Sequence, residues 1–423
     1  MKMLKRLMVL SIALMVILAG CSSGSTNGDK QKESNGVTEL TYWVPFSGSD
    51  GEFMEAMVKK FNESQDEVKV QFMNNKSENY YTKLKTALVS NSAPDVAIAH
   101  VSRFSELLPT GKVEALDELA SEAGLDWSTY GENQVEAVIR DGKHYAVPLD
   151  SHAVIMYYNK KYLGDAGLLN EDGTIKMEPG VDGFTKMLQT LKVELPSDVS
   201  PMVIGSNNVF TFWIWYALVQ QQGGTYFKDG KPTIDTPESK KAMELMQTWL
   251  NEDLMPADIG VNSYDIFKTE KAAVTFTGVW ATGNFELNES LDFAAVSFPQ
   301  LFDQPAAWGD SHTLIIPKQD NKEKQIAGVK FADWLAENGA MWAKAGHVPS
   351  KPSVQDTEEY KALKFRADYA NIMEIVKYMP DSKVLTAVNE AVQQSLVEIN
   401  YGNLTIEEGL KKAQENAEKL VNK

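Results

Sequence analysis

The apolar positions from residue 40 onward alternate between the spacing of a strand and the spacing of a helix. Residues 40–44 form a short apolar run, residues 53–61 carry apolar side chains on one helix face, and residues 68–72 alternate as in a strand. A second helical segment at 80–90 is followed by the apolar run at 96–99. Short apolar strands that alternate with helices predict an α/β fold with a parallel sheet covered on both faces.

The second half of the chain continues with the same kinds of element. Helices are predicted where apolar residues recur every three to four positions, and strands where short apolar runs end near glycine or proline. From about residue 350 to the end we expect mostly amphipathic helix. The predicted helices span 184–191, 209–222, 239–252 and 326–337, and the predicted strands span 202–205, 272–276, 293–298 and 314–316.

One stretch, residues 141–162, breaks this regularity. After a turn signal it reads as extended chain, but Asp150, Ser151 and His152 interrupt what would otherwise be one long apolar strand. An unpaired polar group in a core costs about 1–3 kcal/mol, so a buried polar break needs a reason. We therefore predict that residues 148–154 cross between two lobes and line a ligand cleft.

The first twenty residues have the pattern of a secretory signal peptide. Lys2, Lys5 and Arg6 precede an apolar run at residues 7–18. A helix over this run would be about 18 Å long, short of the roughly 30 Å hydrocarbon core of a bilayer. We therefore expect residues 1–20 to be a signal peptide and not a spanning anchor.

The residues after this run indicate a lipid anchor. Leu18-Ala19-Gly20-Cys21 resembles the lipobox of bacterial lipoproteins, in which the cysteine is lipidated and becomes the first residue of the mature chain. Cys21 is the only cysteine in the sequence, so it has no intrachain disulfide partner. The alternative is a secreted protein with a stray cysteine here. Residues 22–36 contain no aliphatic or aromatic side chain, so we expect 21–36 to be a disordered tether.

The net charge limits the possible partners, and the length indicates the number of lobes. The net charge is −17, and removal of the three basic residues of the signal peptide leaves 38 Lys and Arg against 58 Asp and Glu, a net charge of −20. Such an acidic body argues against nucleic acid and against direct adhesion to anionic lipid. The length of 423 residues favours two or more lobes. The sequence has no apolar run of 18 residues, so no membrane span is expected.

A series of short motifs occurs in a fairly specific order between residues 40 and about 350, although each motif is weak alone. The motifs are Tyr42-Trp43, Lys60-Phe61-Asn62, Ala93-Pro94-Asp95-Val96, Asp141-Gly142-Lys143 with Tyr145 and Pro148, Tyr157-Tyr158-Asn159-Lys160, Lys271-Ala272-Ala273 with Gly278 and Trp280, Ile316-Pro317-Lys318, and the stretches 331–335 and 346–349. In this order they resemble extracellular solute-binding protein family 1, the sugar-binding lipoproteins of ABC importers, which includes maltose-binding proteins.

The resemblance implies a two-lobed α/β fold, similar to the periplasmic binding proteins, with three hinge crossovers and an interlobe cleft. The crossovers would lie at 148–154, at about 297–302 and at 346–354. Lobe 1 would comprise residues 37–149 and 299–345, and lobe 2 would comprise residues 150–298 and 346–423.

The resemblance also implies a function by binding without chemistry. The protein would capture a sugar or oligosaccharide by closing its hinge and would deliver it to the transmembrane subunits of an ABC permease. We expect a monomer without cofactor or catalytic activity. It would be held at the outer face of a bacterial cell membrane by its lipid anchor only.

Tryptophans are the candidate platforms for a sugar, because sugars offer apolar C–H faces with a fringe of hydroxyl groups. Trp43 closes the first strand, and Trp280 follows a strand and a glycine in the pattern that the family uses for a stacking residue. We expect both in the cleft, Trp213 in either cleft or core, and Trp215 in the core. Three others keep helical spacing with apolar residues and are assigned to the core: Trp249, Trp334 and Trp342.

Histidines and two aspartates are the polar candidates. Asp150 neighbours His152 inside the predicted crossover, and Asp310 precedes His312 at a strand entry. For each histidine the alternative is an ordinary loop residue. Four of the five histidines fall at predicted strand ends or crossovers: His100, His152, His312 and His347.

Arg103 can hydrogen-bond a sugar hydroxyl or pair with a nearby carboxylate such as Glu106. Maltose-binding members carry acidic or aromatic residues at some places where this chain has Ser102 and His152, which argues against maltose itself.

Other chemistries are disfavoured or remain open. Asp150 and the histidines offer zinc ligands, but the chain has no HExxH helix and no close His-x-His pair, so no metal site is expected. The GxSxG match at residues 20–24 spans the predicted cleavage site and lacks the required strand-to-helix context. A secreted lipoprotein glycoside hydrolase remains open and would need two carboxylates about 5–9.5 Å apart. The same fold with a non-sugar solute, such as a polyamine, also remains open.

Overall fold

The structure is a computed structural model, and it describes residues 36–46, 50–76, 79–205, 209–257 and 263–422. The predicted signal peptide, Cys21 and all of the tether except Gly36 lie outside the described residues. Residues 37–423 form one unit by their internal contacts. Within the described ranges, no helix combines the length and apolar character that a bilayer crossing requires.

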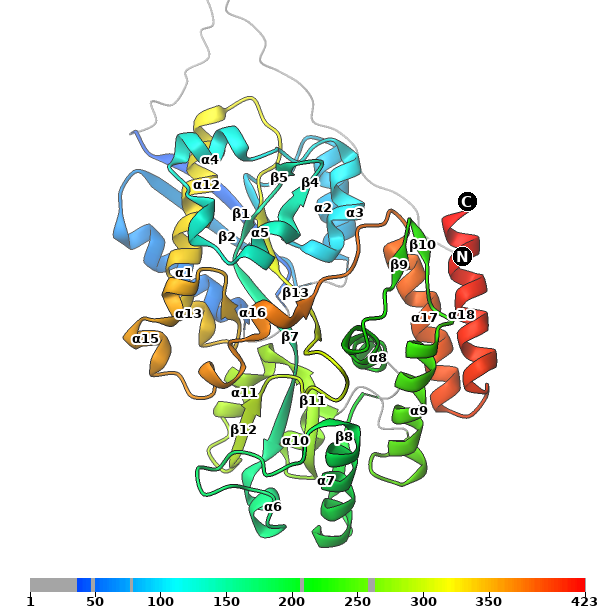
Figure 1. The fold of residues 1–423 in the computed structure, drawn as a ribbon. Coiled ribbons are helices and arrows are strands. Elements are labelled where there is room, and N and C mark those ends of the chain that lie inside the picture. The colour runs from blue at the N-terminus through cyan, green and yellow to red at the C-terminus, as the bar shows by residue number, and fades with distance from the viewer. Residues whose placement is uncertain (1–35, 47–49, 77–78, 206–208, 258–262, 423) are drawn as a thin grey trace, which may run out of the picture. The chain divides into compact units, whose positions relative to one another are not determined.

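Lobe 1 is built on a five-stranded sheet in the order β2-β1-β3-β14-β6, of which β1 and β2 are labelled in Figure 1. The first three strands are parallel, whereas β14 runs antiparallel to both β3 and β6. The predicted parallel sheet is therefore confirmed for the direction of β1, β2, β3 and β6 and wrong for β14, which enters this sheet from lobe 2 and runs antiparallel to its two neighbours. The bounds are β1 (Thr38–Val44), β2 (Val68–Asn74), β3 (Val96–His100), β6 (Val147–Pro148) and β14 (His312–Ile315).

Each face of this sheet carries its own apolar core. Side chains alternate along β3, so Ile98 joins the core under α1 and α12 while Ala97 joins the core under α2. α1 buries Met54, Met57 and Phe61, which recur at helical spacing and were predicted to share one face. The bounds are α1 (Asp50–Ser64), α2 (Tyr80–Val89), α4 (Asp117–Ala123) and α12 (Lys322–Glu337).

Lobe 2 is built on a seven-stranded sheet around β7. The main strand order is β16-β13-β7-β11-β8, and β12 and β15 also pair with β7. β7 is antiparallel to β11, β12, β13 and β15, and all ten of its residues are buried. The bounds are β7 (Asp150–Asn159), β8 (Ser200–Val203), β11 (Ala272–Gly278), β12 (Phe293–Val296), β13 (Ala307–Asp310), β15 (Val348–Pro349) and β16 (Val376–Lys377).

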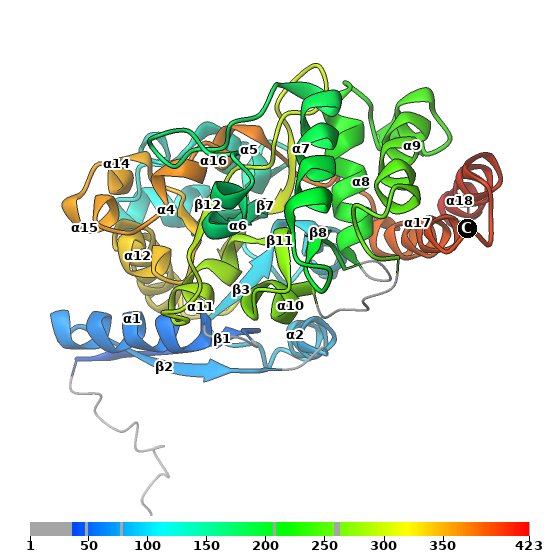
Figure 2. The same ribbon diagram turned by 90° about the horizontal axis from the view of Figure 1, so that it is seen from below.

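Four long helices pack together on one side of lobe 2 (Figures 1 and 2). α8 is apolar around its whole circumference and is almost entirely buried, as expected for a helix with neighbours on all sides. α18 begins with a capping box, in which Thr405 and Glu408 satisfy each other's backbone N–H groups. The bounds are α8 (Val209–Gln221), α9 (Pro237–Asn251), α17 (Leu385–Asn400) and α18 (Ile406–Val421).

The remaining α-helices and strands complete the two lobes. They are α3 (Phe104–Leu107), α5 (Glu132–Val138), α6 (Lys160–Asp165), α7 (Gly180–Glu194), α10 (Ser263–Lys268), α11 (Thr282–Glu286), α13 (Gly339–Ala343), α14 (Pro352–Gln355), α15 (Glu358–Lys361), α16 (Ile372–Ile375), β4 (Ile139–Arg140), β5 (Lys143–His144), β9 (Phe227–Lys228) and β10 (Lys231–Pro232).

The chain passes between the two sheets at three places. The first passage is Leu149, between β6 and β7, and the third is the segment 344–347, between α13 and β15. The second is Ser311, between β13 and β14, and not the predicted segment 297–302. The prediction placed this crossover too early because β12 and β13 both return to β7, pairing with opposite ends of that strand. Residues 299–310 therefore stay with lobe 2.

The three passages are joined to one another by backbone hydrogen bonds. Leu149 N donates to His312 O at 2.8 Å, and Ser350 N donates to Leu149 O at 3.2 Å. The predicted polar break is thus no gap in a strand: β7 begins at Asp150 and runs without interruption. Its polar residues are buried at the point where the passages meet.

Candidate functional site

A cavity of about 680 Å³ is lined by residues of both lobes. Its size falls within the roughly 300–1,000 Å³ typical of small-molecule sites. Most of the predicted binding residues line it, and only Trp43 and Asp150 of that set lie elsewhere. Those that line it are His100, Arg103, His152, Trp213, Trp280, Asp310, His312 and His347.

Trp43 corrects the sequence-based prediction. Its half-buried ring packs with the apolar core under α2, and the Lys83 Nζ lies 4.6 Å from the ring centroid. The prediction placed Trp43 at the strand end facing the cleft. However, alternation along β1 sends Tyr42 and Val44 to one face of the sheet and Trp43 to the other.

Lobe 2 contributes an aromatic wall to the cavity, formed by Trp213, Trp280 and Trp308. Trp213 stacks on Trp308 with ring centroids 3.7 Å apart at 15°, and it meets Trp280 edge to face at 6.1 Å. The Trp280 ring lies against Gly278, where an added Cβ would come within 2.2 Å of the indole. Gly278 therefore allows the ring to lie flat on the backbone. Trp213, which the sequence left open, faces the cleft.

The other assigned tryptophans lie where the sequence placed them. Trp215, Trp249 and Trp342 are at most 1% exposed, and Trp334 packs half-buried against the lobe 1 core. Trp308 was missed. Because Trp308 and Asp310 are two residues apart on one strand, their side chains share a face, and this spacing was visible in the sequence.

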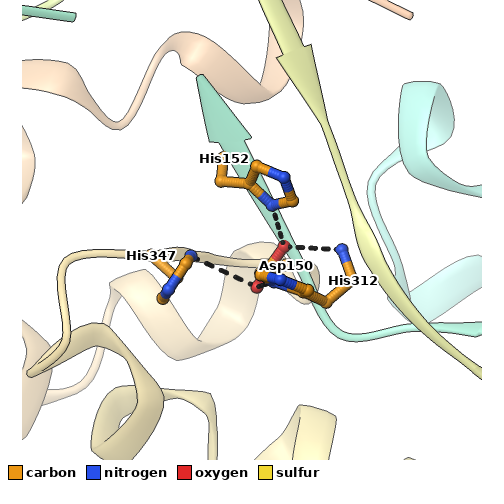
Figure 3. A group of neighbouring side chains, drawn as sticks. All are labelled: Asp150, His152, His312 and His347. Atoms are coloured by element: carbon orange, nitrogen blue, oxygen red, sulfur yellow. Dashed lines mark hydrogen bonds and ion pairs between the residues drawn. The ribbon is translucent and has the colours of Figure 1, made fainter. Parts of the chain in front are cut away.

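A single carboxylate, Asp150, contacts most of the polar side chains at the floor of the cavity (Figure 3). Its Oδ1 lies 3.1 Å from His152 Nδ1, and its Oδ2 lies 2.7 Å from His312 Nδ1 and 3.4 Å from His347 Nδ1. Trp342 Nε1 donates to Oδ2 at 2.6 Å, and the His312 backbone N–H donates to Oδ1 at 3.0 Å. Asp150 is fully buried behind these groups.

The fold brings this cluster together from distant parts of the chain. Asp150 and His152 lie two residues apart on β7 and so share a face, while His312 begins β14. His347 stands just before β15, and its ring stacks on Trp342 at 4.4 Å and 3°. At least one member of the cluster thus lies within or close to each passage between the lobes.

His347 is the least satisfied member of the cluster. It is fully buried, and its Nε2 lies 3.4 Å from Asp50 Oδ2. Within the described part of the chain, neither ring nitrogen of His347 has a hydrogen bond of good geometry, so both 3.4 Å contacts are ionic contacts only.

Electrostatics keep Asp150 ionised. Burial alone would raise the pKa of Asp150, but His312 and His347 lower it well below its usual range. Burial lowers the pKa of His312, against the opposing effect of Asp150. Burial would also lower the pKa of His347, but Asp150 and Asp50 raise it overall. His100, whose Nδ1 contacts the Tyr81 hydroxyl, has its pKa lowered well below the usual value by burial and then by neighbouring histidines.

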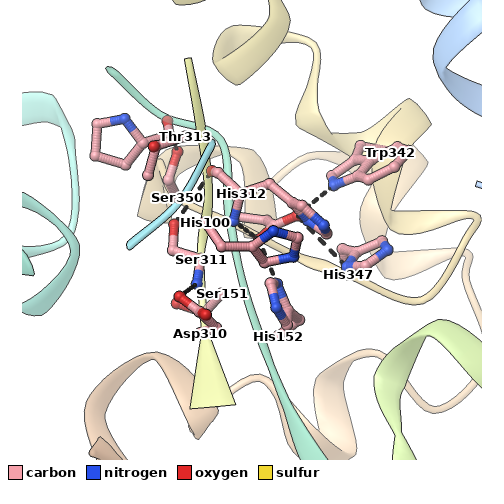
Figure 4. Close-up of polar contacts among 12 residues, drawn as sticks. His100, Ser151, His152, Asp310, Ser311, His312, Thr313, Trp342, His347 and Ser350 are labelled. Atoms are coloured by element: carbon pink, nitrogen blue, oxygen red, sulfur yellow. Dashed lines mark hydrogen bonds and ion pairs between the residues drawn. The ribbon is translucent and has the colours of Figure 1, made fainter. Parts of the chain in front are cut away.

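Polar side chains around the passages find partners within the protein (Figure 4). Ser350 Oγ donates to Pro148 O at 2.8 Å, and Thr313 Oγ1 donates to Ala99 O at 2.7 Å. Asp310 Oδ1 accepts from the Ser311 backbone N–H at 2.9 Å. These bonds hold the cleft floor in one arrangement.

Arg103 pairs with Glu106, one of its two predicted alternatives, and its hydrogen bond to a sugar hydroxyl stays a prediction. Its Nη1 lies 2.7 Å from Glu106 Oε1, and its guanidinium lies 4.9 Å from the centre of the Tyr81 ring while also lining the cavity. Thr386 Oγ1, on α17 of lobe 2, donates to the same Glu106 oxygen at 2.6 Å. Glu106 therefore links the two lobes beside the cavity.

α17 supplies a polar cavity face that the sequence analysis missed. Four polar residues of α17 line the cavity at the i, i+3, i+4, i+7 spacing of one helix face, a pattern that is visible in the sequence. They are Thr386, Asn389, Glu390 and Gln393.

Comparison with known proteins agrees with this architecture. Residues 47–342 match the family model of the bacterial extracellular solute-binding protein. The arabinooligosaccharide-binding protein of Bacillus subtilis (strain 168) is 26% identical over 387 residues, which cover 87% of this chain and 85% of that protein.

Solved structures confirm the two-lobed fold. The sugar-binding protein MalE from Xanthomonas citri superposes with a TM-score of 0.80 at 16% identity, covering 91% of this chain and 98% of that one. UgpB from Mycobacterium tuberculosis, in complex with glycerophosphocholine, gives 0.78 at 16% identity, covering 92% and 99%. Because the family model matches more than half of its residues, the chain belongs to the bacterial extracellular solute-binding protein family.

Proposed function

We propose that this protein is the substrate-binding lipoprotein of an ABC importer and that its cavity binds a sugar or oligosaccharide. The observation that carries the proposal is the pairing of an aromatic wall in lobe 2 with hydrogen-bonding groups of lobe 1. Trp213, Trp280 and Trp308 offer flat apolar faces, and His100 and Arg103 offer polar groups across the same cavity. Such pairing suits a ring with apolar C–H faces and a hydroxyl fringe.

The relatives support a saccharide as the solute. The B. subtilis relative is named for arabino-oligosaccharides, and the X. citri structure is named as a sugar-binding protein. We infer that the solute bridges the two lobes and favours their closed arrangement, which the permease would recognise.

Two carboxylates at the cavity floor, Asp150 and Asp310, are arranged for binding rather than catalysis, and the cavity is also lined by Asp50 and Glu390. Asp150 is fully buried and accepts from the Trp342 indole and the His312 backbone, so it is enclosed rather than presented to a solute. Asp310 lines the cavity, but its Oδ1 is held by the backbone N–H groups of Ser102 and Ser311. A glycoside hydrolase would instead need two carboxylates free to face the scissile bond.

The lipid anchor completes the proposal. Cys21 would carry the lipid, and residues 22–36 would tether the body to the outer face of the membrane. Cys21→Ser should move the protein from the membrane fraction to the soluble fraction without changing solute affinity. A variant that stays with the membrane would contradict the anchor but leave the binding proposal intact.

A thermal-shift screen tests the solute. The body from Val37 would be heated with arabino- and malto-oligosaccharides, monosaccharides, glycerophosphocholine and spermidine in separate wells. A ligand at 100 times its Kd adds about 2.7 kcal/mol to the free energy of unfolding, a clear rise in Tm. We expect at least one saccharide to raise Tm and to remain intact by chromatography. Stabilisation only by a non-sugar solute, or release of a cleaved product, would refute the saccharide-binding proposal.

A further inference from the structure

The cluster at the cavity floor has the composition of a metal site. Asp150, His152, His312 and His347 each offer one ligand atom, and these atoms all lie within 4.8 Å of one another. The expectation of no metal rested on the lack of local motifs such as HExxH. The fold instead gathers these ligands from three separate passages of the chain, an arrangement that short motifs do not reveal.

The distances in the cluster fit a small tetrahedral ion. Zinc binds histidine nitrogen and carboxylate oxygen at about 2.0–2.2 Å, which places neighbouring ligand atoms about 3.3–3.5 Å apart at the corners of a tetrahedron. His312 Nδ1 and His347 Nδ1 lie 2.7 and 3.4 Å from Asp150 Oδ2, and His152 Nδ1 lies 3.1 Å from the other oxygen, Oδ1. Small side-chain adjustments would therefore admit an ion among the four groups.

His347 points independently to a ligand. Its ring is fully buried, and within the described ranges neither nitrogen has a well-formed hydrogen bond. A buried imidazole without a well-formed hydrogen bond costs free energy, which coordination of an ion would recover. With Nδ1 toward the cluster, Nε2 faces the Asp50 carboxylate at 3.4 Å, as in carboxylate–histidine–metal arrangements.

The ligand set selects the class of ion. Three imidazoles and one carboxylate suit zinc and similar divalent transition metals, whereas magnesium and calcium prefer oxygen ligands. The Asp150 carboxylate would offset part of the charge of a bound ion, and Trp342 Nε1 holds that carboxylate in place at 2.6 Å. His152, His312 and His347 line the cavity, so an ion would enter through it.

We propose that Asp150, His152, His312 and His347 bind one divalent transition-metal ion of the zinc class at the floor of the interlobe cavity. The ligands lie within or close to the three passages between the lobes. The bound ion therefore ties these passages together and forms part of the surface that a solute meets. This site is independent of the identity of the solute.

Zinc itself is the probe that tests the site. The full chain, stripped with a chelator and dialysed, is titrated with zinc chloride by isothermal calorimetry, without any saccharide. We expect saturable binding of one ion per chain. Cobalt(II) in place of zinc should give the strong visible absorption of a four-coordinate ion.

Variants locate the ion. His152→Gln and His347→Gln should weaken zinc binding by at least about 100-fold, more than the 10- to 100-fold typical for loss of an outer partner. His144→Gln is the matched control, because His144 lies outside the cluster, stacked on Trp127. It should bind zinc like the parent chain. Circular dichroism of each variant confirms its fold.

Asp50→Asn is a second variant that tests the site if the ligand variants fail to fold. Asp50 touches the cluster only through His347, and its loss should weaken zinc binding by about 10- to 100-fold. Absence of saturable binding to the parent chain would overturn the proposal. So would binding that the ligand variants, or Asp50→Asn in their place, leave unchanged, because the ion would then sit elsewhere.

Discussion

Replacement of Trp280 by alanine separates a binding role from a packing role. The ring lines the cavity, lies on Gly278, and meets Trp213 and His152 edge to face at 6.1 and 5.8 Å. It is half-buried, so one part of its surface packs on lobe 2 while another is available to a solute. Trp280→Ala should therefore weaken solute binding far more than it weakens the fold.

The size of the binding loss follows from the area of the indole. A tryptophan buries about 150–250 Å², and a solute on one face would cover about half of that. At about 25 cal/mol per Å², this contact contributes about 2–3 kcal/mol, or roughly a 20- to 200-fold change in Kd. The loss of edge-to-face contacts should lower the free energy of unfolding by only about 1 kcal/mol, a shift of about 2 °C in Tm.

Calorimetric titration with the saccharide found in the screen measures the Kd, and thermal unfolding without ligand measures the Tm. Trp43→Ala is the matched control, because Trp43 is also half-buried but packs under α2 away from the cavity. It should lower the Tm and leave Kd unchanged. If Trp280→Ala lowers the Tm by 10 °C or more and alters Kd less than about threefold, Trp280 is a core residue and the reasoning fails.

Three further perturbations test other parts of the site. Gly278→Ala should displace the Trp280 ring, because the added alanine Cβ would lie 2.2 Å from that ring. The variant should raise the Kd for the saccharide in calorimetry with little change in Tm, and an unchanged Kd would contradict this. Asp150→Asn should lower the free energy of unfolding by about 3–5 kcal/mol in urea titration at pH 7, since it breaks a buried charge cluster; a loss below 1 kcal/mol would contradict it. Burial would raise the pKa of Glu106, but the Thr386 hydroxyl and Arg103 lower this pKa overall. The ionised Glu106 side chain therefore stabilises the fold at pH values above its pKa in the unfolded chain, and this stabilisation is lost as the pH falls through its pKa in the folded protein. The Tm difference between the parent chain and Glu106→Gln should therefore be present at pH 7 and shrink progressively as the pH is lowered.

The elements of lobe 1 were predictable because each carries its pattern locally. α1 buries residues three and four apart, and β1 to β3 are short apolar runs, so periodicity alone located them. The second crossover was not predictable in this way. β12 and β13 both pair with β7, and a pairing between strands more than a hundred residues apart leaves no local signal.

Most residues that line the cavity could be predicted from the sequence, but their arrangement in space could not. Histidines at strand ends are unusual enough to mark His152 and His312, but only the pairing of Asp310 with His152 across β13 and β7 brings them to one point. Helical spacing correctly predicted that Trp342 is buried, yet spacing cannot show that its indole N–H donates to Asp150. Burial follows from a pattern along one element, whereas a hydrogen-bond partner depends on how separate elements meet.

The polar break in the apolar stretch 148–154 now has a physical explanation. Where three passages of chain converge, their backbone groups and side chains present several donors to one small volume, and one carboxylate can satisfy them together. Asp150 does so for His152, His312 and Trp342, each from a different segment. A charged residue inside a buried strand is therefore a sequence signal for converging crossovers. The residue beside it on the same face, here His152, is the one that reaches the cavity.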